Sequence, residues 1–207
     1  MLPHVRGIFF DFDGTLVDSY SIHIDAYRQT FERFGLTWNE PLFRSTYSPD
    51  WLQTYRAFAL PEEHWSAADK HWVECVSGAC VPAFAGAAAA LTKLRESRQL
   101  GIVTSGSRIR VMQDLQLTAL GEHFGVVITG DDIEHRKPNP DGLHRAMSAL
   151  GLSAAECAYV GDAAADCEMA LAAGVPFIGV RSNFAHWTPP EGTVLVDSVA
   201  DLPALFR

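Results

Sequence analysis

Short apolar runs recur along the chain, and stretches whose apolar residues have helical spacing lie between them. The runs have strand length and are apolar throughout, which is typical of strands buried on both faces of a sheet. Strands that alternate with helices indicate βαβ units and a mostly parallel sheet covered on both sides. We therefore expect an α/β, Rossmann-like fold with strands near residues 7–10, 100–103, 126–128, 158–160 and 175–180, and a weaker sixth at 194–196. The helices are expected near residues 87–98, 108–117, 141–150 and 166–173.

One long interval interrupts this alternation. About 90 residues separate the first two expected strands, several times the length of an ordinary connection. The interval contains no convincing strand, and its apolar residues recur at helical spacing, as at Ile24, Tyr27, Phe31 and Phe34. We expect a helical insert, or cap, over residues 18–82, docked on a core of residues 1–17 and 83–207.

The insert holds four of the five tryptophans of the chain: Trp38, Trp51, Trp65 and Trp72. A small helical bundle needs large side chains to fill its core, which is one explanation for them. The other is that some of them line a ligand pocket.

Composition narrows the class of function. The chain is 48% hydrophobic and 20% charged, as in ordinary globular proteins. Its net charge of −9 argues against a nucleic-acid partner, because a phosphate-contacting surface needs excess Lys and Arg. It leaves open a small anionic substrate held by a few local cations or a metal.

The four cysteines are too few and too scattered for a disulfide framework or a zinc site. We expect Cys75, Cys80, Cys157 and Cys167 to be small buried hydrophobic residues in a reducing compartment. The N-terminal stretch reaches Asp11 too soon for a signal peptide. No run approaches the length needed to span a bilayer, so we expect a soluble, cytoplasmic protein with no membrane partner, and a monomer by default.

Two aspartates directly follow the first expected strand. Asp11 and Asp13 lie two positions apart, and in extended chain such side chains share a face. The carboxyl ends of parallel strands are where open α/β sheets bind ligands, and carboxylates are common ligands of Mg²⁺. An Asp-Gly turn that merely ends the strand explains Asp13 and Gly14. It leaves Asp11 unexplained, because an unpaired charge against an apolar run is costly.

The segment Asp11-Phe12-Asp13-Gly14-Thr15-Leu16-Val17-Asp18-Ser19 resembles the first motif of the haloacid dehalogenase superfamily of phosphotransferases. The resemblance implies a Rossmann-like core and three further motifs at later strand ends, in order. It also implies a helical cap after the first motif, where this chain has its insert. By layout, the chain is most similar to the phosphoglycolate phosphatase and beta-phosphoglucomutase branch.

The second motif would follow the second strand, at Thr104-Ser105-Gly106. A hydroxyl and free backbone N–H groups at such a turn can cradle a phosphate, although Ser and Thr also commonly cap helices. The resemblance makes Thr104 the phosphate-binding hydroxyl and gives Ser105 and Gly106 as backbone donors.

The third motif would be Lys137, which precedes Pro138. A lone lysine beside prolines is more often a solvated loop residue, but Pro138 and Pro140 restrict where this one points. The resemblance makes it the cation that neutralises the phosphate and the attacking carboxylate. Its neighbours His135 and Arg136 are expected at the surface.

The fourth motif would be Asp162 and Asp166, after the fourth strand. Both acids would also be favourable at a helix N-terminus, and they share a face if the helix has begun. The resemblance makes Asp162 a metal ligand and Asp166 either a ligand or an orienting partner of Lys137. Relatives often carry a hydroxyl at the position of Ala163.

Together the motifs imply Mg²⁺-dependent hydrolysis of a small phosphomonoester, such as phosphoglycolate, a sugar phosphate or pyrophosphate. Asp11 would be the nucleophile that forms an aspartyl-phosphate, and Asp13 the general acid and base. The carboxylate of Asp11, the backbone carbonyl of Asp13 and the carboxylate of Asp162 would hold the metal.

Several alternatives remain at this point. Dehalogenases of the superfamily lack the acid at the position of Asp13, and the phosphonate-cleaving branch, which uses a cap lysine such as Lys70, has a different first motif. A phosphosugar mutase would have the same core, and His23 stands where such enzymes have a cap-hinge histidine. A catalytically silent regulatory protein on this fold is a reading of another class.

In the insert, His23 and Arg44 are the candidate substrate contacts; Arg44 could meet a second anionic group. The segment from Arg181 to Trp187 departs from the small turn common in relatives, and it receives no functional assignment.

Overall fold

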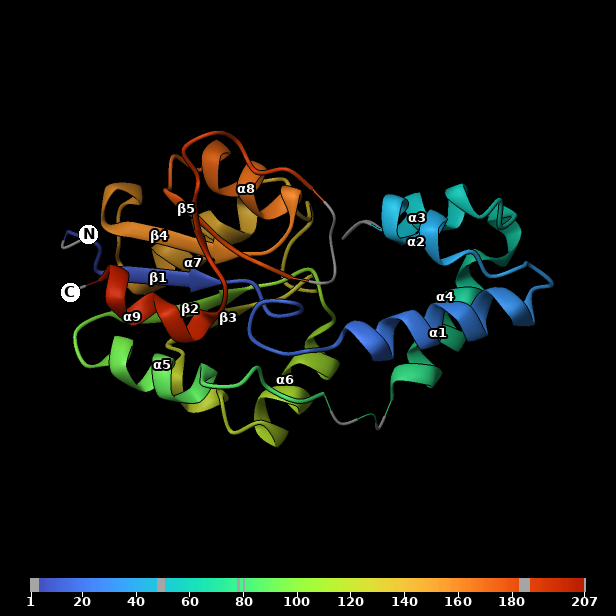
Figure 1. Cartoon of the computed structure of the whole chain (residues 1–207), viewed down its shortest axis with the longest axis horizontal. Helices are drawn as coiled ribbons and strands as arrows, with labels where there is room; N and C mark the ends of the chain where they lie inside the picture. Colours follow the sequence, from blue (N-terminus) through green and yellow to red (C-terminus); the bar gives the residue numbers. More distant parts are fainter. Residues whose placement is uncertain (1–3, 48–50, 78, 80, 183–186, 207) are drawn as a thin grey trace.

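A computed structural model describes residues 4–47, 51–77, 79, 81–182 and 187–206. Its centre is a six-stranded sheet in the order β3-β2-β1-β4-β5-β6, and every strand pairing is parallel (Figure 1). The expected α/β fold with a parallel sheet is confirmed. The strands are β1 (Gly7–Phe10), β2 (Gln99–Val103), β3 (Val126–Ile128), β4 (Cys157–Gly161), β5 (Phe177–Val180) and β6 (Val194–Val196).

Strand β1 lies in the middle because β2 and β3 extend the sheet on one side and β4 to β6 on the other. The chain therefore reverses its direction of sheet growth beside β1, which is where open α/β sheets place their ligand crevice. The register aligns Phe10 with Ile102 and with Val160. Consequently the residues that follow β1, β2 and β4 emerge close together at one edge.

Helices cover both faces of the sheet (Figure 1). Ile8 and Phe10 of β1 join the apolar cluster on one face, whereas Phe9 joins the cluster on the other, as strand alternation requires. Gly101 of β2 leaves room for the Phe9 ring, since a Cβ at Gly101 would lie 2.7 Å from it. The first face packs against α5 (Ala87–Arg95), α6 (Arg108–Leu117) and α9 (Leu202–Leu205), and the second against α7 (Asp141–Leu150) and α8 (Ala164–Ala172).

In residues 18–82, the helices and turns of the described part make up the regular structure, flanked by the isolated bridge at Val17, and these helices lie to one side of the sheet (Figure 1). Phe31 stacks on Phe58 at 4.2 Å between ring centroids, within an aromatic cluster of its own. The two connections to the core run side by side, since Val17 bridges Ala83. The helices are α1 (Tyr20–Arg33), α2 (Glu40–Thr46), α3 (Trp51–Ala57) and α4 (Trp65–Val76), with a short 3₁₀ turn at Glu62–His64.

The structure corrects some details of the expectations. Helix α5 ends at Arg95, α8 begins at Ala164, and β5 begins at Phe177. Cys75 is half-buried rather than buried, whereas Cys157 and Cys167 are buried as expected; Cys80 lies outside the described residues. None of the helices in the described part of the chain has the length and apolar character needed to cross a membrane.

The structure places the four tryptophans of the insert in two groups. Trp38 and Trp65 pack against the aromatic cluster of the insert, as the first explanation expects. Trp51 and Trp72 also pack there, and both line the cavity that faces the core.

Candidate active site

The four predicted motifs meet in one cavity of about 700 Å³. Asp11 follows β1, Thr104 follows β2, and Asp162 follows β4, because the parallel register brings these strand ends together. Residues of the inserted helices form the opposite wall. The predicted site residues that line the cavity are Asp11, Asp13, Thr104, Ser105, Gly106, Lys137, Asp162, Asp166, His23 and Arg44.

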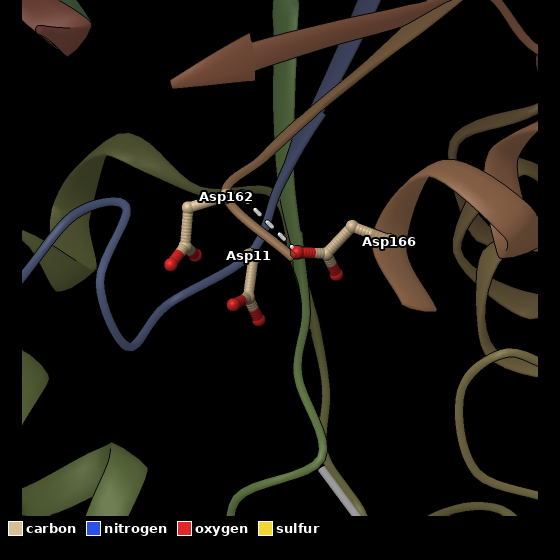
Figure 2. A group of neighbouring side chains, drawn as sticks. All are labelled: Asp11, Asp162 and Asp166. Carbon is tan, nitrogen blue, oxygen red and sulfur yellow. Dashed lines mark hydrogen bonds between the residues drawn. The ribbon is translucent and has the colours of Figure 1, made fainter. Parts of the chain in front are cut away.

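Three carboxylates form its acidic centre (Figure 2). Asp11, Asp162 and Asp166 each offer an oxygen within 4.8 Å of the others. Burial raises the pKa of both Asp11 and Asp162, and the charges of neighbouring acids raise it further, although Lys137 opposes this at Asp11. A cluster of buried oxygen donors that repel one another fits a hard divalent cation.

Lys137 supplies one positive charge to this cluster. Its Nζ donates to Asp11 Oδ1 at 2.6 Å and to Asp166 Oδ1 at 2.7 Å. Burial alone would lower the pKa of Lys137, but the charges of the two aspartates raise it above its usual value. The ammonium group is therefore charged and fixed beside Asp11. The peptide bond between Lys137 and Pro138 is cis.

Asp166 holds this arrangement in place. Its Oδ1 accepts from Lys137, and its Oδ2 accepts from the backbone N–H groups of Asp162 and Ala163 at 3.2 and 3.1 Å. A Cβ at Gly161 would lie 2.5 Å from that Oδ2, so the carboxylate needs a glycine there. Because α8 begins only at Ala164, Asp162 lies before the helix, and the two acids do not share a helical face. These hydrogen bonds are those expected if Asp166 orients the side chain of Lys137.

The carboxylate of Asp13 has different hydrogen-bond partners from the carboxylates of the acidic centre. Its carboxylate accepts from Ser19 Oγ at 2.6 Å and from both terminal nitrogens of Arg110. Burial would raise the pKa of Asp13, but the charge and hydrogen bonds of Arg110, together with His23 and Ser19, lower it to about 2. Asp13 is ionised as a result.

The sequence did not indicate a role for Arg110. It lies in the first turn of α6, where a basic residue is typical of a solvated helix face, and only its position shortly after Thr104 hinted at a role.

The second motif forms a compact turn at the cavity wall. Thr104 is buried, and its Oγ1 accepts from the backbone N–H of Gly106 at 3.1 Å. Ser105 Oγ is buried and makes no hydrogen bond to any described residue. The turn leads into α6, and its residues Thr104, Ser105 and Gly106 line the same cavity as the acidic centre.

The two candidate contacts from the insert both reach the cavity. His23 is buried in α1 with its Nε2 3.8 Å from Asp13 Oδ1 and its Nδ1 3.4 Å from the Tyr47 hydroxyl. Arg44 forms an ion pair with Glu40 at 2.7 Å. Arg136, expected at the surface, is instead half-buried, with its guanidinium 4.2 Å from the centre of the Trp51 ring.

Trp187 is a further residue of the cavity wall that the sequence did not indicate. Its Nε1 donates to the backbone carbonyl of Asp162 at 2.7 Å, and its ring packs edge-on against Phe177. Residues 183–186 of the same segment lie outside the described residues.

Comparison with known proteins identifies the family of the chain. Residues 8–180 match the sequence model of the family described as haloacid dehalogenase-like hydrolase. The chain belongs to this family. The resemblance inferred from the four motifs is thus confirmed, and this haloacid dehalogenase-like chain is an enzyme of the phosphatase type.

Among curated proteins, the chain is similar to a phosphoglycolate phosphatase of Cupriavidus necator, with 36% identity over 66% of this chain and 61% of that protein. It is 31% identical to the pyrophosphatase PpaX of Bacillus velezensis over 85% and 83% of the two chains. Among solved structures, a predicted phosphoglycolate phosphatase from Haemophilus somnus shares the fold, with a TM-score of 0.88 at 18% identity and full coverage of both chains.

Hydrolases of this family generally use a divalent metal, and the donor set here is compatible with one. All three acids of the cluster carry oxygen donors, and none offers sulfur or nitrogen.

Proposed function

We propose that this enzyme hydrolyses a small phosphorylated metabolite with Mg²⁺, by way of an aspartyl-phosphate on Asp11. The observation that carries the proposal is the position of Asp11: a carboxylate at the end of β1, bonded to Lys137 at 2.6 Å and beside the Thr104 turn. The curated relatives act on phosphoglycolate and pyrophosphate according to their names, which supports substrates of that size. A sugar phosphate is the third candidate.

The Mg²⁺ ligands would be the carboxylates of Asp11 and Asp162 and the backbone carbonyl of Asp13. Bound there, the ion would offset the negative charge that builds up on the phosphoryl oxygens. Asp166 would stay outside the ligand set, because both of its oxygens accept hydrogen bonds from Lys137 and from backbone N–H groups.

Asp11 attacks phosphorus in line with the leaving oxygen, so that a P–O bond to Asp11 forms while the bond to the leaving group breaks. Attack by one anion on another is repulsive. Lys137 offsets part of that repulsion from its fixed place beside Asp11. The Thr104 hydroxyl and the N–H of Ser105 would stabilise the phosphoryl oxygens, and the N–H of Gly106 would join them once it leaves Thr104 Oγ1.

Asp13 would act as the general acid in one half-reaction and as the general base in the other. It gives a proton to the leaving oxygen in the first half and takes one from the attacking water in the second. The bonds from Arg110 and Ser19 favour the ionised form of Asp13, which is the form that takes the proton of the water in the second half. The proton gained in that step is the one that Asp13 would give to the leaving oxygen of the next turnover.

The test is phosphate release from a panel of phosphorylated compounds, with Mg²⁺ and with chelator. The panel holds phosphoglycolate, pyrophosphate, hexose phosphates and nucleoside monophosphates. We expect metal-dependent release that the Asp11→Asn variant loses and the Asp18→Asn variant keeps, because Asp18 is exposed. Phosphate release that persists in Asp11→Asn would refute the assignment of Asp11 as the nucleophile.

Two other functions become outcomes of this experiment. A putative beta-phosphoglucomutase from Thermotoga maritima shares the fold, with a TM-score of 0.72 at 20% identity. Interconversion of hexose phosphates without phosphate release would indicate a mutase. The absence of both reactions on every compound would indicate a silent regulatory protein. The presence of all the side chains that the proposed mechanism needs argues against that function. The monomeric state stays a prediction, for light scattering to test.

A further inference from the structure

Arg110 is a cation in an unfavourable place. It lies in the first turn of α6, where the helix dipole disfavours positive charge. Its side chain is only 14% exposed, and burial of a charge is costly unless partners compensate. Those partners are Asp13 and Asp114. Because Arg110 also lines the cavity, its charge faces the substrate's side of the site.

Not every N–H group of the Arg110 guanidinium is used in a hydrogen bond within the described part of the chain. Of its five N–H hydrogens, one from each terminal nitrogen goes to Asp13, and a second from Nη1 goes to Asp114 at 3.2 Å. The hydrogens that remain are those of Nε and the outer one of Nη2, and they donate to no described residue. These two lie on the same edge of the group, which is the edge that binds a carboxylate or phosphate with paired hydrogen bonds.

The position of Arg110 restricts which anion can reach that edge. A Cβ at Gly106 would lie 2.5 Å from Arg110 Nη2, so the absence of a side chain lets the guanidinium lie directly against the phosphate-binding turn. Asp13, the expected proton donor to the leaving oxygen, occupies the adjoining edge. An anion bound to Arg110 is therefore attached close to the bridging oxygen, and not deep among the inserted helices.

The other cavity arginines are less suited to this task. Arg44 uses its Nε and Nη2, the corresponding edge, to bond Glu40 at 2.9 and 2.7 Å. Arg136 lies over the Trp51 ring.

We propose that Arg110 is a specificity-determining residue that binds a second anionic group on the leaving part of the substrate. The preferred substrates are then phosphate compounds whose leaving group carries its own negative charge within two or three bonds of the bridging oxygen. A carboxylate on the adjacent carbon and the second phosphate of pyrophosphate both meet this requirement, and a neutral sugar does not. This inference rests on the proposed hydrolysis for its kinetic test, but not for its binding test.

The kinetic test compares kcat/KM for phosphoglycolate with kcat/KM for its neutral amide, in the presence of Mg²⁺. The two compounds have the same shape and differ in the charge of the leaving group. In Arg110→Gln we expect the preference for phosphoglycolate to fall by about ten- to a hundredfold, the usual effect of losing a charged hydrogen-bonded contact. The ratio is independent of how much of the variant is folded, because one preparation serves both substrates.

Matched variants locate the effect. Asp114→Asn touches the guanidinium on the Nη1 side and leaves the Nε edge intact, so the ratio should stay as in the wild type. Arg110→Lys keeps the charge without the fork and should give an intermediate ratio. An unchanged ratio in Arg110→Gln, even with both rates reduced, would overturn the proposal, as would a change confined to Arg44→Gln.

A binding measurement separates this proposal from the proposed function. Calorimetry gives the affinities of Asp11→Asn for phosphoglycolate and for the amide, with and without Arg110→Gln. A preference for phosphoglycolate that Arg110→Gln abolishes supports the proposal, even if the wild-type enzyme releases no phosphate from either compound. Equal affinities in the presence of Arg110 would refute it, even if hydrolysis occurs.

Discussion

Trp187 donates its indole hydrogen to the backbone carbonyl of Asp162 at 2.7 Å. This bond ties the segment after β5 to the residue that follows β4. The ring of Trp187 also packs on Phe177 within the apolar cluster of that face. A residue without a counterpart in the four motifs thereby fixes the backbone of a predicted metal ligand.

We expect Trp187→Phe to weaken metal binding while the fold persists. Phenylalanine keeps a ring against Phe177 but leaves the Asp162 carbonyl without its donor, at a cost of about 1 kcal/mol in the free energy of unfolding. The Mg²⁺ concentration for half-maximal phosphate release should rise severalfold, with less change in kcat at saturating metal. Trp38→Phe, in the insert, is the matched control. Equal Mg²⁺ dependence in both variants would contradict a positioning role.

Much of the core could be predicted from local pattern. The apolar runs ending at Phe10, Val103 and Val160 are strands because burial on both faces demands uninterrupted apolar residues. Once the strands are parallel, the polar residues at their carboxyl ends must converge. This explains why Asp11 and Asp162, far apart in sequence, could be expected in one site.

The remainder depends on contacts that local pattern does not encode. The partner of Asp13 is a residue 97 positions away, and the cavity-side position of Arg110 follows from how α6 packs on the sheet. Likewise Arg136 meets Trp51 only because the inserted helices lie over the loop before α7. Side chains at strand ends were predictable, whereas side chains brought together by helix packing were not.

Replacing the lysine at the acidic centre should remove activity and stability together. Lys137→Met keeps much of the volume but leaves Asp11 and Asp166 buried without their cation, which is typically destabilising by about 3–5 kcal/mol. The loss in urea unfolding at pH 7 should shrink toward pH 5, because protonation removes the charge on the carboxylates. Lys93→Met is the control, since its exposed pair with Glu96 contributes little. A loss that is the same at both pH values would speak against buried charge as its cause.

The glycine at the end of β4 should be required for activity. In Gly161→Ala, the new Cβ would lie 2.5 Å from Asp166 Oδ2 and displace the carboxylate that holds Lys137. We expect phosphate release to fall at least tenfold. Gly121→Ala provides the comparison, because its Cβ would have no neighbour closer than 3.6 Å. If both variants retained wild-type rates, Asp166 would not need its observed position.

His23 should make the fold sensitive to mild acid. Burial lowers the pKa of His23 from 6.5 to about 4, against the opposing charge of Asp13, so the imidazole is neutral in the folded protein at neutral pH. Between pH 6.5 and 4 the unfolded chain binds a proton at this residue and the folded chain does not. The free energy of unfolding therefore falls as the pH decreases, by about 2 kcal/mol at pH 5 from this residue. Urea unfolding at pH 7, 6 and 5 should show a steeper loss for the wild type than for His23→Gln. Parallel pH profiles would mean that His23 titrates alike in the folded and unfolded chains.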